Sequence, residues 1–229
     1  MFEHVRLICF DLDDTLWPCR PVIEEAEQVC YAWLEAEAPR LTSRYSLDQL
    51  RAHRLQVGRR QPHIAHDMTE VRRHSLAQLL NQTGYAEALA QQASDVFRQA
   101  RNRVTPYEDV KDALARLSHH FTLVSVTNGN SQIEHTPLAD SFDHSLSAAE
   151  VGAAKPDPAM FHAASARSGI PLSSFLHVGD DPLRDVQAAR NLDVKAVWVN
   201  RDGKAWPTTL ARADLEVVGL SELVVSLIS

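Results

Sequence analysis

The sequence lacks the features that mark secreted, membrane-spanning and nucleic-acid-binding proteins. Its 229 residues include three cysteines, too few and too odd in number for a disulfide framework, which favours a reducing compartment. No apolar run reaches the length of a membrane span, and the apolar stretch near the N-terminus is too short for a signal peptide. The net charge of −7 argues against nucleic acid as the main partner, because a phosphate backbone needs a basic surface. We therefore expect a cytoplasmic protein with no membrane or nucleic-acid partner.

The sequence does contain two kinds of segment that alternate. Short runs that are apolar on both faces predict buried parallel strands at residues 5–10, 121–126, 175–178 and 196–199. Apolar residues at helical spacing predict helices at residues 107–117, 158–168, 182–191 and 220–228. In the second of these helices, Asp157 is the expected N-cap and Gly169 the expected stop. Strands that alternate with helices predict a doubly wound, Rossmann-like α/β fold with a parallel sheet.

Residues 18–105 interrupt this alternation. The segment contains no convincing strand and predicts four helices, at residues 21–37, 46–57, 64–83 and 86–103. It begins directly after the first strand, and ligands of open α/β sheets bind outside the carboxyl ends of the strands. We therefore predict an α/β core of residues 1–17 and 106–229, and a helical cap of residues 18–105 over the binding site.

Two aspartates mark the end of the first predicted strand. Asp11 and Asp13 are two positions apart, so both side chains emerge on the same side of the strand. Two close carboxylates repel each other unless a cation or a shared proton lies between them, and hard oxygen ligands of this kind suit Mg²⁺. The alternative is an acidic turn in which aspartate only ends the strand.

Two polar signals follow in the second half of the chain. Thr127 and Asn128 precede a glycine, and the hydroxyl and backbone N–H groups of such a turn can bind an oxyanion, although an ordinary Asn-Gly turn has the same sequence. Lys155 lies just before a predicted helix, where it is either a cation in a pocket or a solvated surface charge.

A second acidic cluster follows the strand at 175–178. It contains Asp180, Asp181 and Asp185, which are either further ligands or the N-cap and first turn of a helix. A parallel sheet would bring this cluster and the earlier polar signals to the edge that carries Asp11. The coincidence favours one shared site.

Four segments resemble the motifs of the haloacid dehalogenase-like phosphohydrolase superfamily, in that family's order. They are FDLDDT, VTNG, KPDP and GDDPLRD, and their spacing covers essentially the whole chain. The resemblance implies a Mg²⁺-dependent phosphatase with a small helical cap inserted between the first two motifs. The dehalogenase branch needs no metal and, by the same resemblance, lacks the second aspartate of the first motif. Asp13 therefore argues against dehalogenation.

The resemblance also implies roles in the reaction. Asp11 would be the nucleophile that carries an aspartyl phosphate, and Asp13 the general acid and then the general base. Thr127 and the backbone N–H of Asn128 would bind the phosphate. Lys155 would balance the charge of the nucleophile and the phosphate.

For the metal, the resemblance implies a ligand set that spans the first and last motifs. The Asp11 carboxylate, the Asp13 backbone carbonyl and Asp180 would bind Mg²⁺. Asp185 would support these ligands, and Asp181 is the competitor for that role.

A bacterial subgroup is similar at a finer level. The segments FDLDDTLWPCRPVI, HDMTEVRRHSL and VTNGNSQ resemble phosphatases that act on FMN and on the phosphorylated aminoribitylaminouracil of riboflavin synthesis. The rival functions are a phosphomutase acting on a sugar phosphate, a non-enzymatic binding or regulatory member of the same fold, and dehalogenation. The sequence leaves the physiological substrate and the oligomeric state open.

Several cap residues could line the substrate side, and at least one is expected to set substrate choice: Arg20, His63, His66, Asp67, Arg72 and Arg73. The alternative for each is a solvated helix surface with charge pairs. Trp17 and Trp33 are expected to pack within the cap, and Trp198 within the strand core.

Overall fold

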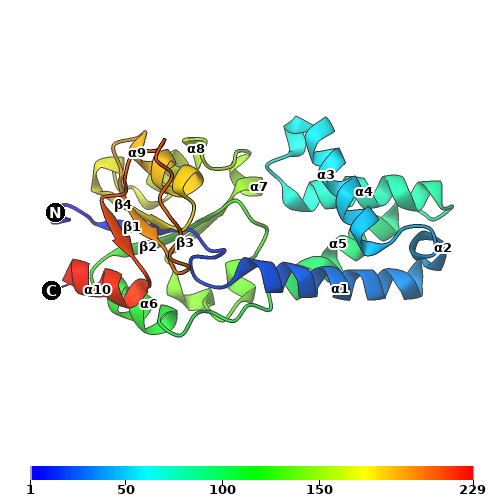
Figure 1. Ribbon diagram of the computed structural model, residues 1–229, viewed down its shortest axis with the longest axis horizontal. Coiled ribbons are helices and arrows are strands. Elements are labelled where there is room, and N and C mark those ends of the chain that lie inside the picture. The colour runs from blue at the N-terminus through cyan, green and yellow to red at the C-terminus, as the bar shows by residue number, and fades with distance from the viewer. Residues whose placement is uncertain (1, 229) are drawn as a thin grey trace. The chain divides into compact units, whose positions relative to one another are not determined.

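The computed structural model describes residues 2–228, which form two compact units (Figure 1). Unit 1 consists of residues 2–18, 105–129 and 133–228, and unit 2 of residues 19–104 and 130–132. The predicted core also included residues 1 and 229, which lie outside the described residues. Residues 130–132, assigned to the core from the sequence, go with unit 2. That unit 2 acts as a cap stays a prediction.

Unit 1 is built on a six-stranded sheet in the order β3-β2-β1-β4-β5-β6, in which every neighbouring pair is parallel. The strands are β1 (Leu7–Phe10), β2 (Thr122–Thr127), β3 (His144–Ser147), β4 (Phe175–Gly179), β5 (Lys195–Val199) and β6 (Leu215–Val217). All of β1 is buried, because it lies in the middle of the sheet and its sequence LICF is apolar on both faces. The predicted doubly wound α/β fold is confirmed.

Helices cover both faces of this sheet. Helices α6 and α10 pack together on one face, and α8 and α9 lie on the other (Figure 1). The helices of unit 1 are α6 (Val110–Ser118), α7 (Ala148–Val151), α8 (Ala159–Ser168), α9 (Ala188–Arg190) and α10 (Leu220–Ile228). Shorter turns are the 3-10 segments η2 (Ile133–His135), η3 (Ala139–Ser141) and η4 (Leu172–Ser174), and the π-helical segment η5 (Pro182–Gln187).

Two helices of unit 1 begin later than predicted. Helix α6 starts at Val110 instead of residue 107. Helix α8 starts at Ala159, one residue after the predicted Pro158. The N-cap of this helix is Pro158 and not the predicted Asp157, although Asp157 Oδ1 accepts a hydrogen bond from the Ala159 N–H at 2.9 Å. Gly169 ends α8 as predicted and has a φ of 70°, which a residue without a side chain adopts most readily.

Unit 2 is helical and has its own apolar core. Its elements are α1 (Cys19–Glu37), α2 (Pro39–Thr42), α3 (Leu47–Arg60), η1 (Pro62–Ile64), α4 (Met68–Gln82) and α5 (Ala88–Arg101). The core includes Leu34, Leu80 and Phe97, and Trp33 packs against it as predicted. Within residues 2–228, no helix combines the length and the apolar character needed to cross a membrane.

Capping explains where the helices of unit 2 begin. The hydroxyl of Ser46 accepts a hydrogen bond from the Gln49 N–H, and the Gln49 side chain accepts one from the Ser46 N–H, which starts α3. Asp67 accepts hydrogen bonds from two N–H groups at 2.9 Å, so α4 starts at Met68 and not at the predicted residue 64.

Candidate active site

Asp11 directly follows β1 at the carboxyl edge of the sheet of unit 1. Its backbone N–H continues the pairing with β4 by donating to Val178 O at 2.9 Å, so the rigid middle of the sheet fixes its position. The side chain is largely buried. Its Oδ1 accepts a hydrogen bond from Lys155 Nζ at 2.7 Å. The structure therefore brings together Asp11 and Lys155, which are far apart in the sequence.

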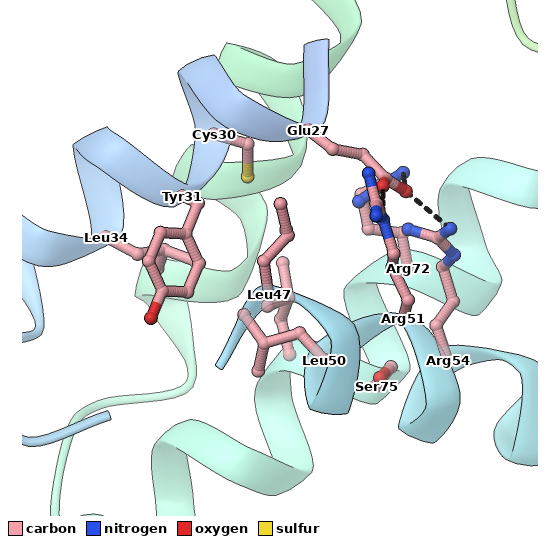
Figure 2. Close-up of a pocket in the computed structure, with 11 residues that line it drawn as sticks. Glu27, Cys30, Tyr31, Leu34, Leu47, Leu50, Arg51, Arg54, Arg72 and Ser75 are labelled. Carbon is pink, nitrogen blue, oxygen red and sulfur yellow. Dashed lines mark hydrogen bonds and ion pairs between the residues drawn. The ribbon is translucent and has the colours of Figure 1, made fainter. Parts of the chain in front are cut away.

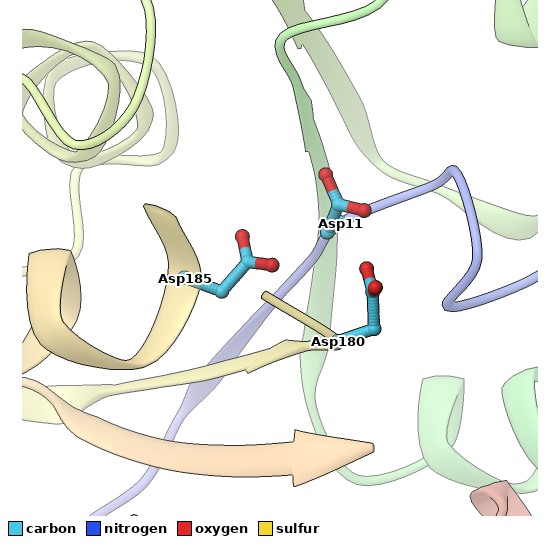
Figure 3. A group of neighbouring side chains, drawn as sticks. All are labelled: Asp11, Asp180 and Asp185. Carbon is cyan, nitrogen blue, oxygen red and sulfur yellow. The ribbon is translucent and has the colours of Figure 1, made fainter. Parts of the chain in front are cut away.

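Three carboxylates gather at this edge. Oxygen atoms of Asp11, Asp180 and Asp185 all lie within 4.8 Å of one another. Figure 3 shows them converging from three elements: the end of β1, the turn after β4, and η5. A methyl group on residue 179 would overlap the carboxyl of Asp185, so Gly179 leaves the space that Asp185 occupies.

Lys155 joins two of these carboxylates in a buried chain of hydrogen bonds. Its Nζ also donates to Asp185 Oδ1 at 2.6 Å, and His177 Nε2 lies 3.0 Å from the same oxygen. Burial opposes ionisation of Asp185, but Lys155 and His177 together hold the pKa of its carboxyl below the usual range. Burial likewise opposes the charge on Lys155, yet Asp11 and Asp185 keep its pKa above the ordinary value.

The site carries more negative charge than Lys155 can balance. Burial raises the pKa of Asp11 well above its ordinary value, against the attraction of Lys155 and with repulsion from Asp185. Burial and repulsion from the neighbouring aspartates raise the pKa of Asp180 to about 7. A hard divalent cation would offset the repulsion between these crowded carboxylates, and their oxygen atoms are the ligands that such a cation prefers. The residues present therefore fit Mg²⁺.

The side chain of Asp13 is held by Trp17, which the sequence predicted to pack within the cap. Trp17 Nε1 donates a hydrogen bond to Asp13 Oδ1 at 2.9 Å, and a short parallel bridge joins the two residues. Trp17 is fully buried and belongs to unit 1, so the prediction that it packs within the cap is wrong. The turn between the two residues includes Asp14 at a φ of 60°, a conformation that aspartate tolerates better than most residues.

Thr127 and Asn128 lie at the end of β2, beside β1. The hydroxyl oxygen of Thr127 accepts a hydrogen bond from the Gly129 N–H at 2.9 Å, which leaves its O–H proton to donate elsewhere. The Asn128 side chain donates to Lys155 O and accepts from Lys155 N, both at 2.7 Å. The side-chain amide of Asn128 therefore fixes the backbone of Lys155. The sequence predicted only a contact between the backbone N–H of Asn128 and phosphate, and did not predict this role of the side chain.

The two candidates for support of the metal ligands differ in position. Asp181 caps η5 by accepting hydrogen bonds from the N–H groups of Leu183 and Arg184. Asp185 lies one turn further, is almost completely buried and belongs to the carboxylate cluster. The segment predicted as one helix at 182–191 is π-helical up to Gln187 and α-helical only at α9.

The cap candidates all lie in unit 2 and have local partners or exposed positions. The side chain of Arg20 is 87% exposed and pairs with Glu24, one turn along α1. His66 is half-buried, directly before the cap of α4. Arg73 pairs with Glu70, and Arg72 stacks on the ring of Phe97. His63 lies in η1 and Asp67 caps α4, as described above.

Three supporting residues were missed from the sequence. His177 lies inside a predicted apolar strand, where a lone buried polar residue is a signal for a partner. Trp198, correctly predicted in the strand core, also donates from Nε1 to the backbone oxygen of Asp180 at 2.7 Å. Thr15 lies within 3.4 Å of both Asp11 and Asp180; as the last residue of FDLDDT, it could have been suspected.

Known proteins share this arrangement of sequence and fold. The family model of the haloacid dehalogenase-like hydrolases matches residues 5–193. The chain belongs to this family. Among its curated relatives, the 5-amino-6-(5-phospho-D-ribitylamino)uracil phosphatase YigB of Escherichia coli (strain K12) is 32% identical, over 96% of this chain and 95% of that protein. The phosphoserine phosphatase of Thermus thermophilus is 29% identical, over 95% of this chain and 99% of that protein.

A solved haloacid dehalogenase-like structure has the same fold along nearly the whole chain. The crystal structure described as 2-haloacid dehalogenase from Pseudomonas syringae pv. Tomato DC3000 superposes with a TM-score of 0.89 at 35% identity, over 98% of this chain and all of that one. The relatives of this haloacid dehalogenase-like hydrolase are thus named for two reactions, phosphate hydrolysis and dehalogenation. The residues of this chain indicate which of the two fits its site.

Proposed function

We propose that this chain is a Mg²⁺-dependent phosphatase that hydrolyses a small phosphomonoester through an aspartyl phosphate on Asp11. The observation that carries the proposal is the cluster of Asp11, Asp180 and Asp185, in which a single lysine pairs with Asp11 and Asp185. A metal-free reaction gains nothing from this excess of buried carboxylate, whereas a metal-dependent one uses it. Bound there, Mg²⁺ would offset the charge of the phosphate and of its attacking carboxylate.

In the first proposed step, an Asp11 oxygen forms a bond to phosphorus while the bond from phosphorus to the leaving oxygen breaks. Asp13 gives its proton to that leaving oxygen. In the second step, Asp13 takes a proton from water as the water attacks the aspartyl phosphate, so that phosphate leaves and Asp11 is regenerated. The hydrogen bond from Trp17 orients Asp13 for both transfers.

The remaining residues bind and position the phosphate. The free proton of the Thr127 hydroxyl and the backbone N–H of Asn128 donate to phosphate oxygens, and Lys155 supplies a fixed positive charge beside Asp11. Asn128 and Asp185 hold the lysine from its backbone and its ammonium ends. Electrostatic positioning of this kind accounts for most of the catalysis in phosphoryl transfer.

For the substrate, we propose FMN or a phosphorylated intermediate of riboflavin synthesis. The support is the segment FDLDDTLWPCRPVI and the 32% identity to YigB, whose name specifies a ribitylaminouracil phosphate. Unit 2 would act as the cap of this enzyme, with Arg20 or His66 contacting the substrate. Alanine variants of these two residues should alter relative rates between substrates; unchanged ratios would remove them from the proposal.

The test is phosphate release from a panel of compounds, with Mg²⁺ and with excess chelator. The panel contains FMN, the ribitylaminouracil phosphate, phosphoserine and a sugar phosphate, together with 2-chloropropionate for halide release. We expect phosphate release that requires Mg²⁺ and disappears in Asp11→Asn. Halide release in chelator would instead establish a dehalogenase, and an isomerised sugar phosphate without free phosphate would establish a mutase.

A further inference from the structure

An arginine far along the chain contacts the turn that carries Asp13. Arg201 follows β5 at the carboxyl edge of the sheet, the edge that also carries the carboxylate cluster. Its Nε donates a hydrogen bond to the backbone oxygen of Thr15 at 3.2 Å. Thr15 is the middle residue of the turn from Asp13 to Trp17, so this hydrogen bond joins the turn to the loop after β5.

The side chain of Arg201 is itself fixed by two neighbours. Its guanidinium pairs with Asp109 at 3.1 Å, and the two side chains are only 16% and 20% exposed. The guanidinium carbon also lies 4.0 Å from the centre of the Tyr107 ring. Asp109 in turn accepts a hydrogen bond from the backbone N–H of Leu220, at the start of α10. These contacts fix the plane of the guanidinium, and with it the direction in which Arg201 donates.

Two further features of unit 1 support the same turn. A Cβ on residue 219 would lie 2.5 Å from Asp109 Oδ2, so Gly219 leaves the space in which Asp109 meets the arginine. The backbone N–H of Tyr107 donates to the backbone oxygen of Leu16 at 2.9 Å. Two consecutive backbone oxygens of the turn, those of Thr15 and Leu16, therefore accept hydrogen bonds from residues that are distant in the sequence.

The contacts inside the turn have a different effect. The Asp14 N–H donates to Trp17 O at 2.8 Å, and Trp17 Nε1 donates to the Asp13 carboxylate. These hydrogen bonds keep the shape of the turn, whereas Arg201 joins it to the rest of unit 1. The position of Asp13 matters because a general acid must lie within hydrogen-bond reach of its acceptor, and a displacement of about 1 Å can cost about a hundredfold in rate.

We propose that Arg201 is a positioning residue for Asp13, a role that rests on the phosphatase function proposed above. Through the backbone of Thr15, it holds the general acid within reach of the leaving oxygen. The residue lies outside the four segments FDLDDT, VTNG, KPDP and GDDPLRD. Because Arg201 acts on the turn that carries the acid, its loss should impair proton transfer to the leaving oxygen more than attack by the nucleophile.

The test compares kcat/KM for two phosphomonoesters, benzyl phosphate and p-nitrophenyl phosphate, at saturating Mg²⁺. This ratio reports the reaction up to departure of the leaving group, and so isolates the first proton transfer from Asp13. Benzyl alkoxide is a strong base that needs the proton, whereas p-nitrophenolate leaves without it. Arg201→Gln should lower kcat/KM about tenfold to a hundredfold for benzyl phosphate, and about threefold or less for p-nitrophenyl phosphate.

Arg190→Gln is the matched control. Arg190 pairs with Asp214 at 3.2 Å elsewhere in unit 1, so the variant makes the same charge change and also breaks an arginine–aspartate pair. Its kcat/KM should stay at the wild-type value for both esters. Asp109→Asn replaces Arg201→Gln if that variant does not fold; it weakens the pair that orients Arg201 and should show the same preference between esters.

Asp13→Asn distinguishes failure of this proposal from failure of the proposed function. Alone, it should show the same leaving-group preference. Adding Arg201→Gln to it should lower kcat/KM for benzyl phosphate by about twofold or less, because the acid that Arg201 positions is already lost.

If Asp13→Asn discriminates between the esters and Arg201→Gln does not, the role of Arg201 is overturned and the phosphatase function stands. The same holds if the effects of the two changes multiply in the double variant. If Asp13→Asn does not discriminate, or if the wild type releases no phosphate, the proposed function fails and the role of Arg201 fails with it.

Discussion

Lys155 is the cation that pairs with two of the carboxylates of the site. Its ammonium is almost fully buried between Asp11 and Asp185, and Asn128 holds both polar atoms of its backbone. Such a group stays charged only because its partners are also buried and fixed. In the proposed reaction, the lysine would present its charge to the phosphate without having to reorganise, which is the condition for strong electrostatic catalysis.

Asp13→Asn should separate proton transfer from binding. The amide keeps the shape and can still pair with Trp17, but it cannot donate and recover a proton in the proposed cycle. We expect kcat to fall by about a hundredfold to ten-thousandfold, the usual contribution of a general acid or base. The Mg²⁺ concentration for half-maximal rate should stay near the wild-type value. A kcat close to that of the wild type would contradict the role of Asp13.

Asp185→Ala and Asp181→Ala should differ in both stability and metal dependence. Removing Asp185 leaves a buried lysine and a buried histidine without their shared partner, a loss of about 3 kcal/mol in the free energy of unfolding. Removing Asp181 takes away a helix cap, which costs about 1 kcal/mol. Urea unfolding without Mg²⁺ measures both. Only Asp185→Ala should also need more Mg²⁺ for activity, and equal effects would contradict the assignment.

At the scale of elements, strand β5 supports the turn after β4. Trp198 on β5 donates to the backbone oxygen of Asp180, and its ring packs edge-on against Trp206 at 4.9 Å between centroids. The contact fixes the backbone that carries a proposed metal ligand.

Trp198→Phe keeps most of the packing and removes the donor. We expect the Mg²⁺ concentration for half-maximal rate to rise about tenfold or more, in the range found when a group that orients a metal ligand is lost. At saturating Mg²⁺, kcat should be close to the wild-type value. Trp206→Phe is the control, since Trp206 donates to Leu210 O and not to Asp180. Identical Mg²⁺ dependence in the two variants would show that the hydrogen bond does not position Asp180.

Helices α1, α3 and α4 are joined by Glu27 and its arginines (Figure 2), which makes unit 2 sensitive to acid. Burial opposes ionisation of Glu27, but Arg54, Arg51 and Arg72 hold its pKa below the ordinary 4.5. A carboxyl with a lower pKa in the folded state stabilises that state fully above the unfolded pKa, and loses this contribution as pH falls through the folded one.

The stability advantage of the wild type over Glu27→Gln should therefore be present at neutral pH and shrink below about pH 4.5, near the unfolded pKa of glutamate. Urea midpoints of both proteins across this range, read by circular dichroism, give the difference. Glu24→Gln is the control on the same helix, because Glu24 belongs to an exposed pair with Arg20 that contributes little. A constant difference across pH would contradict the role of Glu27.

The strands that could be predicted from the sequence are those that are buried on both faces, because burial requires a run of apolar residues. Strands β1, β2, β4 and β5 are mainly apolar and buried and were predicted, whereas β3 and β6 were not. The sequence of β3, HSLS, is mostly polar because it is an edge strand, and β6 has only three residues. Edge strands carry a weaker apolar signal, since they need not be buried on both faces.

The same distinction holds for the site. Residues at the strand ends were predicted, because a parallel sheet collects them at one edge. The side-chain partners of these residues were not predicted. In the pairing of β1 with β4, His177 lies opposite Cys9, two residues before Asp11. The sequence of a single strand does not determine this register. Trp17 and Trp198 were predicted as packing residues. The hydrogen bonds from their indole N–H groups to Asp13 and Asp180 could not be predicted, because the sequence does not show which acceptors lie beside them.

At the scale of the whole molecule, the distribution of charge bears on which of two reactions this family member performs. The chain carries a net charge of −7, and its sheet concentrates three aspartates at one edge with a single lysine between two of them. An anionic protein that collects further negative charge where it would bind an anionic substrate needs a cation there. The charge distribution therefore favours metal-dependent phosphoryl transfer over halide displacement.

The most direct measurement is transfer of radiolabelled phosphate from a phosphomonoester to the enzyme in a single turnover, quenched in acid. In the presence of Mg²⁺, we expect transient label on the peptide that contains Asp11. The label should persist longer in Asp13→Asn, which lacks the base for the second step, and be absent in Asp11→Asn. Turnover without any label on the enzyme, label on another residue, or phosphate release by Asp11→Asn at the wild-type rate would contradict it.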